Sequence, residues 1–183
     1  RPTSKRHEYA HANTCHVQKD GNILVSFRQL DLIILVNRQT NQIDWEMSDR
    51  SWGGQHDCQK LENGNIIVFA NGSEQYTPEH SRILEINPES KEVVWQYTGQ
   101  PKITFFSPRI SGLCRLANGN TFIIEGNHGR LFEVTQSGEI CWEYISPFFH
   151  DIPVHGTVNW VFRARKYSKG DAKLNNLMAN LGT

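Results

Sequence analysis

The feature that most constrains this chain is a unit that occurs three times. Each unit opens on a glycine turn, and the three turns read Asp20-Gly21-Asn22, Asn63-Gly64-Asn65 and Asn118-Gly119-Asn120. Each unit closes on a tryptophan that follows a serine or threonine by five residues, and these tryptophans are Trp45, Trp95 and Trp142. One turn type and one packing residue in a constant order predict a repeat architecture.

Short apolar runs follow the turns, and they are rich in β-branched residues. Runs of this kind, bounded by turn residues, predict strands. The runs directly after the turns are 23–25, 66–68 and 121–124, and further runs stand at 32–36, 82–86 and 130–134. With one strand before each turn and one strand around each tryptophan, every unit has four predicted strands.

Four short antiparallel strands in a unit of about 40 to 50 residues are typical of a β-propeller blade. We therefore predict an all-β chain built of four-stranded antiparallel blades, at about residues 10–47, 55–98 and 110–145. The tryptophans are expected to pack between neighbouring blades. Residues 1–183 are predicted to form a single partial propeller domain.

A propeller ring has about four to eight blades, whereas this sequence contains three complete units. Two interpretations account for the difference. The chain is the carboxy-terminal half of a longer protein, or two copies associate to close one ring. The first is preferred, because an isolated half would leave sheet faces and strand edges exposed.

Composition excludes some partners. Lysine plus arginine equal aspartate plus glutamate at 19 each, so there is no overall field to attract nucleic acid or anionic lipid. No apolar stretch approaches the roughly 18 residues that indicate a membrane span. We predict neither a nucleic-acid partner nor a membrane-spanning segment.

The pattern changes after Tyr144. Residues 145–156 contain two prolines and no periodicity, and are predicted to form a loop. The remainder, 157–182, is predicted to contain a strand from Val158 to Tyr167 and a helix from Asp171 to Leu181. The apolar residues of this helix recur at helical spacing and are expected to pack on the propeller.

Polar residues on the first strands mark one end of the predicted channel. Eight positions before the turn glycine, the three units carry Asn13, His56 and Ser111. His11 stands two residues before Asn13 and shares its face of the strand, because side chains in a strand alternate with a period of two. Inner strands of a propeller run in the same direction, so these side chains should gather at one mouth of the channel.

The units resemble the arylsulfate sulfotransferase family. In the first unit the resemblance rests on His11-Ala12-Asn13 and on the run from Asp20 to Arg28. In the second it rests on Gln55-His56-Asp57 and Phe69-Ala70-Asn71-Gly72. It continues through Trp142-Glu143-Tyr144 to Phe162-Arg163-Ala164-Arg165-Lys166-Tyr167, so that it covers nearly the whole chain.

The resemblance implies a six-bladed propeller of which three blades are absent here. It also implies an enzyme that moves a sulfuryl group from a phenolic sulfate ester to a phenolic acceptor. The transfer would pass through a covalent sulfohistidine and would use no nucleotide donor. Its partners would be a small aryl sulfate and a phenol, and a periplasmic or secreted location is implied by the resemblance alone.

The resemblance implies His56 as the nucleophile, a role that suits a neutral imidazole. The guanidinium of Arg28 fits the anionic oxygens of the transferring group, and His11 fits the phenolate leaving group. Asn13 and Ser111 are the predicted substrate-binding residues. The scheme requires no metal and no cofactor, and these residues have no recognisable metal-ligand spacing.

Two other function classes stay open. The first is a non-catalytic propeller that binds a ligand, a glycan or a protein on its channel face. The second is a quinone-cofactor dehydrogenase, because the spacing from threonine to tryptophan resembles the docking repeats of those propellers. The second ranks lower, since the sequence shows no carboxylate-rich calcium site.

Overall fold

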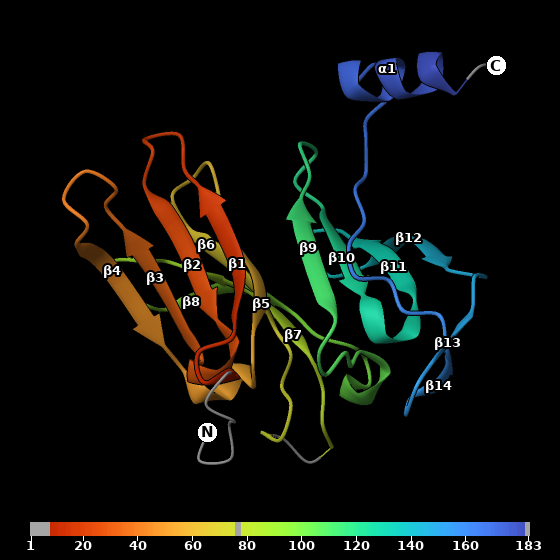
Figure 1. The fold of residues 1–183 in the computed structure, drawn as a ribbon, viewed down its shortest axis with the longest axis horizontal. Coiled ribbons are helices and arrows are strands. Elements are labelled where there is room, and N and C mark those ends of the chain that lie inside the picture. The colour runs from red at the N-terminus through yellow and green to blue at the C-terminus, as the bar shows by residue number, and fades with distance from the viewer. Residues whose placement is uncertain (1–7, 76–77, 182–183) are drawn as a thin grey trace.

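Three four-stranded antiparallel sheets form the body of the molecule (Figure 1). The computed structural model describes residues 8–75 and 78–181. The first sheet contains β1 (Ala12–Val17), β2 (Ile23–Phe27), β3 (Leu32–Val36) and β4 (Ile43–Ser48). The second contains β5 (His56–Lys60), β6 (Ile66–Ala70), β7 (Arg82–Ile86) and β8 (Val93–Tyr97). The third contains β9 (Ser111–Arg115), β10 (Thr121–Glu125), β11 (Arg130–Val134) and β12 (Ile140–Ile145).

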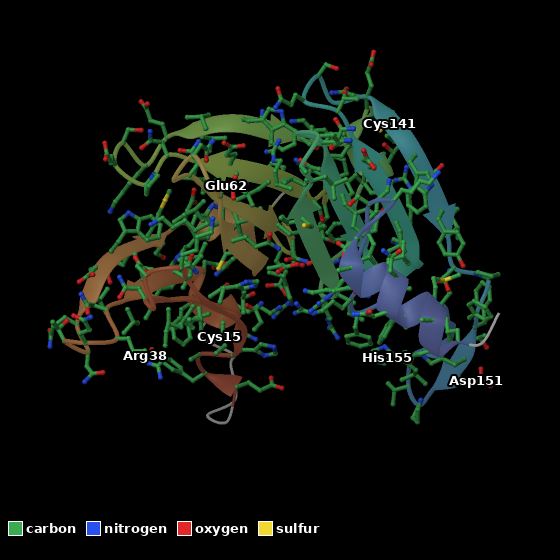
Figure 2. All side chains as sticks on the ribbon, turned by 90° about the horizontal axis from the view of Figure 1, so that it is seen from above. Cys15, Arg38, Glu62, Cys141, Asp151 and His155 are labelled. Carbon is green, nitrogen blue, oxygen red and sulfur yellow. The ribbon has the colours of Figure 1, made fainter. Side chains whose placement is uncertain are left out.

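The strands of each sheet pair in chain order, and the first strands β1, β5 and β9 are neighbours. Viewed from above, the three sheets follow an arc (Figure 2). Short 3-10 turns lie at Arg28–Leu30, Arg50–Trp52, Lys102–Thr104 and Gly126–His128. A small hairpin of β13 (His150–Ile152) and β14 (Gly156–Val158) and the helix α1 (Ala172–Asn180) follow the third sheet. The predicted all-β architecture of four-stranded antiparallel sheets with one short carboxy-terminal helix is therefore confirmed.

The repeated turns have one backbone geometry. Gly21, Gly64 and Gly119 have φ angles of 84°, 88° and 85°, a region that residues with a Cβ rarely adopt. In each turn the residue after the glycine donates its backbone N–H to the side chain before the glycine, at 3.0 or 3.1 Å. This local bonding explains why the same three-residue pattern recurs.

The hydrophobic core lies between sheets. On β6, Ile66 and Val68 pack toward the first sheet, whereas Ile67 and Phe69 pack toward the third. All four side chains are buried, because neighbouring sheets cover both faces of the strand. The second sheet is thus the middle layer, which holds the three first strands in a fixed relation.

Two of the repeated tryptophans join neighbouring sheets, as predicted. The indole Nε1 of Trp45 donates to the carbonyl of Pro88 at 2.8 Å, and that of Trp95 donates to the carbonyl of Gln136 at 2.8 Å. Both acceptors lie in the turn before the last strand of the next sheet. Trp142 departs from the prediction with 40% of its surface exposed, because no further four-stranded sheet follows it in the described chain.

The carboxy-terminal region differs from three predictions. The loop predicted at 145–156 is wrong in part, because this stretch contains β13 and the start of β14. The prediction of a strand from Val158 to Tyr167 is wrong, because only Val158 belongs to a strand and 159–167 has no regular secondary structure. The helix is confirmed as α1, capped by the Asp171 side chain, which accepts the backbone N–H of Lys173 at 2.8 Å. Its predicted packing on the propeller is wrong: the helix has no buried residue, and it lies apart from the sheets in Figure 1.

The prediction that 1–183 is one partial domain stays a prediction, and its ends, 1–7 and 182–183, lie outside the described residues. Within the described chain no helix is long and apolar enough to cross a membrane.

Replacing Trp95 by Phe keeps an aromatic ring in the core and removes the hydrogen bond to Gln136. We expect the free energy of unfolding to fall by about 1 kcal/mol, the usual value of one hydrogen bond, as measured by urea denaturation followed by circular dichroism. Trp142→Phe is the matched control, since the described structure gives its indole N–H no hydrogen bond. Equal losses in the two variants would contradict the bridging role of Trp95.

Candidate active site

A pocket of about 880 Å³ opens at the end of the inner strands where β5 and β9 begin. Its lining includes all five residues that the sequence singled out, namely His11, Asn13, Arg28, His56 and Ser111. These residues come from all three sheets and from the loops that connect them. The common direction of the inner strands brings them to one mouth.

His56 is the first residue of β5, and its ring is held through one nitrogen. Nδ1 lies 2.8 Å from Oδ1 of Asn71 and 3.1 Å from the carbonyl oxygen of Gly54. The amide Nδ2 of Asn71 donates to the carbonyl of Ser107 and to Oγ of Ser111, which fixes the amide orientation. Since Nδ1 faces two acceptors, it carries the ring hydrogen, and the lone pair belongs to Nε2.

The pKa of His56 is lowered from 6.5 to about 4; burial is the largest cause, and the nearby positive charge of Arg28 acts in the same direction. The hydrogen bond to Asn71 acts in the opposite direction and only partly offsets these effects. The imidazole is therefore neutral at neutral pH. A neutral ring with a defined tautomer is the form of histidine that acts as a nucleophile.

Arg28 and His11 belong to the first sheet and approach the same pocket. Arg28 follows β2, and its backbone N–H donates to the carbonyl of His11 at 3.0 Å. Its guanidinium donates to the carbonyl of Pro108 at 3.4 Å, across the pocket mouth from its own sheet. His11 has a φ angle of 49°, an uncommon conformation for a residue with a side chain.

Asn13 and Ser111 have structural contacts besides their place in the pocket lining. Nδ2 of Asn13 donates to the carbonyl of Gln55 at 2.7 Å, which ties β1 to the start of β5. One of the two amide hydrogens of Asn13 is thus used within the protein. Oγ of Ser111 accepts from Asn71 at 3.0 Å, so Ser111 supports the residue that holds the His56 ring.

Asp57 lies beside His56 in the chain, but its contacts run to other strands. Its φ angle is 47°, and the pairing of β5 with β6 shifts register at this point. The backbone N–H donates to Oγ1 of Thr14 on β1 at 2.9 Å, and Oδ2 accepts the backbone N–H of Leu113 on β9 at 3.0 Å. The bulge therefore turns a buried carboxylate into a link among three inner strands.

Burial by itself raises the pKa of the Asp57 carboxyl, yet the net pKa lies below its usual value. Hydrogen bonds from His16, the Leu113 amide and Gln59 stabilise the charged form, as does the positive charge of Arg163. The histidine that contacts the Asp57 carboxylate is thus His16, whose Nε2 lies 3.6 Å from Oδ1 of Asp57. Asp57 supports the strand on which His56 stands rather than the His56 ring.

Sequence reasoning missed Asn71 as a site residue, although a signal for it was present. Asn71 stands seven residues after its turn glycine, and Arg28 stands seven residues after Gly21. Both follow the second strand of a sheet, at the end that reaches the pocket. Comparison of the units at this position would have placed Asn71 beside the predicted nucleophile.

A family model described as arylsulfotransferase (ASST) matches residues 1–147. The chain belongs to the arylsulfotransferase family. No curated protein matches it. Family membership supports a transferase.

Solved structures similar to this chain show the same propeller-like fold. A streptogramin B lyase has a TM-score of 0.56 at 17% identity over 77% of this chain and 42% of its own. A protein of unknown function from Bacteroides caccae has a TM-score of 0.55 at 19% identity over 73% and 45%. Virginiamycin B lyase from Staphylococcus aureus has a TM-score of 0.52 at 16% identity over 75% and 42%. The chain spans less than half the length of these structures.

Within the described residues, no group of three or more His, Cys, Asp or Glu side chains is arranged to hold a metal ion. The pocket lining contains two imidazoles, three guanidinium groups and amide donors, together with the carboxylates of Glu8, Asp57, Glu74 and Glu79. The cationic and amide groups are of the kind that bind and stabilise anionic oxygens.

The state of His56 is directly measurable by nitrogen NMR of the imidazole rings. We expect hydrogen on Nδ1 at pH 7 and titration near pH 4. In Asn71→Ala the pKa of His56 should fall further, because the lost hydrogen bond raises it in the parent. Titration of His56 near its ordinary value of about 6.5 in the parent would contradict the site geometry.

The same shift predicts a pH dependence of stability. Between about pH 6.5 and 4 the unfolded chain binds a proton at His56 that the folded chain does not bind. The contribution of His56 to stability therefore decreases as the pH falls through this window. His56→Ala should lack this part of the pH dependence of the free energy of unfolding. His128→Ala, at an exposed histidine outside this pocket, is the control and should keep it.

Proposed function

We propose that this site transfers a sulfuryl group between phenolic oxygens through a covalent intermediate on His56. The supporting observation is the contact of Nδ1 with Asn71 and Gly54, which leaves the lone pair on Nε2 in a residue that lines the pocket. The family supports transfer chemistry in general. The identity of the nucleophile and the two-step course are the proposal.

In the first step Nε2 of His56 attacks the sulfur of an aryl sulfate. The N–S bond forms as the S–O bond to the aryl group breaks, and the electron pair of that bond goes to the phenolate oxygen. The imidazole then carries a positive charge, which the two acceptors at Nδ1 stabilise. Arg28 offers donors to the sulfuryl oxygens, whose negative charge it offsets.

In the second step an acceptor phenol gives up its proton and its oxygen attacks the same sulfur. The N–S bond breaks, and its electron pair returns to Nε2. His11 is the proposed proton donor to the first phenolate and the proposed base for the second phenol. Asn13 and Ser111 are proposed to bind the substrate at the wall of the pocket, Asn13 through its second amide hydrogen.

The decisive experiment mixes the protein with a chromogenic aryl sulfate and an acceptor phenol. The rate of phenol release should be at least about a hundredfold lower in His56→Ala than in the parent, since the nucleophile is removed. His128→Ala should release phenol at the parent rate. Mass spectrometry of the parent after an alkaline quench should show one added SO₃ group on His56.

Release by His56→Ala at the parent rate would contradict the covalent mechanism. A folded parent that releases no phenol across a panel of donors and acceptors would leave the alternative, a propeller that binds a ligand or protein without catalysis.

We also propose that further blades complete a ring around this pocket, supplied by the missing half of a longer chain. One face of β12 supports this, because Trp142 and Tyr144, which share that face, are 40% and 41% exposed. At the equivalent place on the second sheet, Trp95 is bonded to a turn of the next sheet. A second copy of the chain is the alternative occupant.

Sedimentation of the 183-residue chain separates these two cases. We expect the mass of a single chain at micromolar concentration, because the completing blades belong to other residues of the same polypeptide. A stable dimer whose formation depends on Trp142 would favour the second copy.

A further inference from the structure

Residues 159–167, here termed the crossing segment, lie against the third sheet and reach the pocket. The backbone N–H of Val161 donates to the carbonyl of Gly126 at 3.0 Å. The side chain of Asn159 donates to the carbonyls of His128 and Ser146 at 3.1 and 3.2 Å. A Cβ at Gly126 would overlap the carbonyl oxygen of Val161, so the glycine allows this close approach.

The second sheet shows what normally occupies the place at which the crossing segment ends. Glu85 accepts from Asn63 and Asn65 through Oε1, at 3.0 and 2.8 Å. Its Oε2 accepts from the guanidinium of Arg115, the last residue of β9, at 2.6 Å. That guanidinium also lies 4.8 Å from the ring centre of Trp95. An inner strand of one sheet thus caps the outer strands of the sheet before it.

The third sheet repeats this arrangement with Lys166 in the position of Arg115. Glu133 accepts from Asn118 and Asn120 through Oε1, and its Oε2 accepts from Nζ of Lys166. Nζ lies 4.7 Å from the ring centre of Trp142. Lys166 therefore has the contacts that the last residue of a following inner strand would have.

The register of Lys166 places two other residues at the pocket. Counting back four and three positions from Arg115 gives Ser111 and Gly112, at the end of β9 that begins at the pocket. The same count from Lys166 gives Phe162 and Arg163. Both of these line the pocket together with His56 and Arg28. The crossing segment thus occupies the place of a fourth inner strand, although it pairs with no strand.

We infer that the crossing segment completes the substrate site, with Arg163 as a second guanidinium for the sulfuryl oxygens and Phe162 as the surface for the aryl ring. This rests on the proposed function of the pocket. The family match ends at residue 147, before the segment begins.

Arg163 has the properties required of an anion contact. In the described structure its guanidinium makes no hydrogen bond and no ion pair within 4 Å, although its charge helps to lower the pKa of Asp57. The oxygens of Asp57 are already bonded to other groups, including Leu113 and Gln59. The planar donors of Arg163 are thus available to a ligand in the pocket, where they match anionic oxygens.

Phe162 has the properties required of an aryl contact. It is 66% exposed, an uncommon state for phenylalanine, and it lines the pocket. Its ring lies edge-on to Trp160 at 6.4 Å between ring centres, and Trp160 in turn contacts His155, labelled in Figure 2. This row of rings holds Phe162 in place for an aromatic ligand.

The test measures binding and transfer separately. An aryl sulfonate has a carbon–sulfur bond in place of the ester bond and cannot give up its sulfuryl group to a histidine. Calorimetry should show that Arg163→Gln binds it about 10- to 100-fold more weakly than the parent. Arg165→Gln, an exposed neighbour outside the pocket lining, should bind like the parent.

Two further variants separate the roles within the segment. Phe162→Ala should lower the affinity for the aryl sulfonate while leaving the affinity for inorganic sulfate unchanged. Lys166→Met should weaken binding of the aryl sulfonate without altering any lining residue. Lys166→Arg should retain this binding, because Arg115 fills the same place beside the second sheet. Thermal unfolding of each variant establishes that it is folded.

The outcomes distinguish the two proposals. Loss of sulfonate binding in Arg163→Gln would support the crossing segment even if the parent transfers no sulfuryl group, in which case only the proposed function fails. Parent-like sulfonate binding by Arg163→Gln, together with weakened binding by Arg28→Gln, would overturn the role of the segment.

Discussion

The buried carboxylate of Asp57 is the constraint on which the rest of the site depends. The backbone N–H of Asp57 donates to Thr14 on one neighbouring strand, and its carboxylate accepts from Leu113 on the other, so three inner strands meet at one residue. An ionised carboxylate is costly to bury unless donors surround it. Those donors come from separate sheets, and their convergence requires that the sheets be correctly placed. The polar link thereby specifies the arrangement that the apolar core stabilises.

The geometry of the candidate site follows from this link. The bulge at Asp57 directs its carboxylate into the strand interface, while His56, one residue earlier, stands at the pocket. Asn71 then orients the imidazole, and Ser111 orients Asn71. Side chains whose own partners are fixed lose little freedom when a substrate binds, which is the condition for a preorganised site. Backbone strain at such positions is retained because the surroundings define it.

Departures from the repeat are as informative as its constant parts. Glu85 and Glu133 pair across the sheet with Trp95 and Trp142, whereas Leu35 pairs with Trp45. Only the units with glutamate need a cation from the following element. The third unit receives that cation from a segment without regular structure, because contacts of a side chain depend on position rather than on strand pairing.

The sequence by itself determined the elements whose cause is local. Glycine turns and period-two apolar runs located the strands, and the equal offset of Asn13, His56 and Ser111 from those turns predicted their common place. Tertiary structure alone decided that Trp142 is uncovered and that α1 lies apart from the sheets. These outcomes depend on which neighbour is present across a sheet interface, and contacts between such distant parts of the chain leave no periodic signal in the sequence.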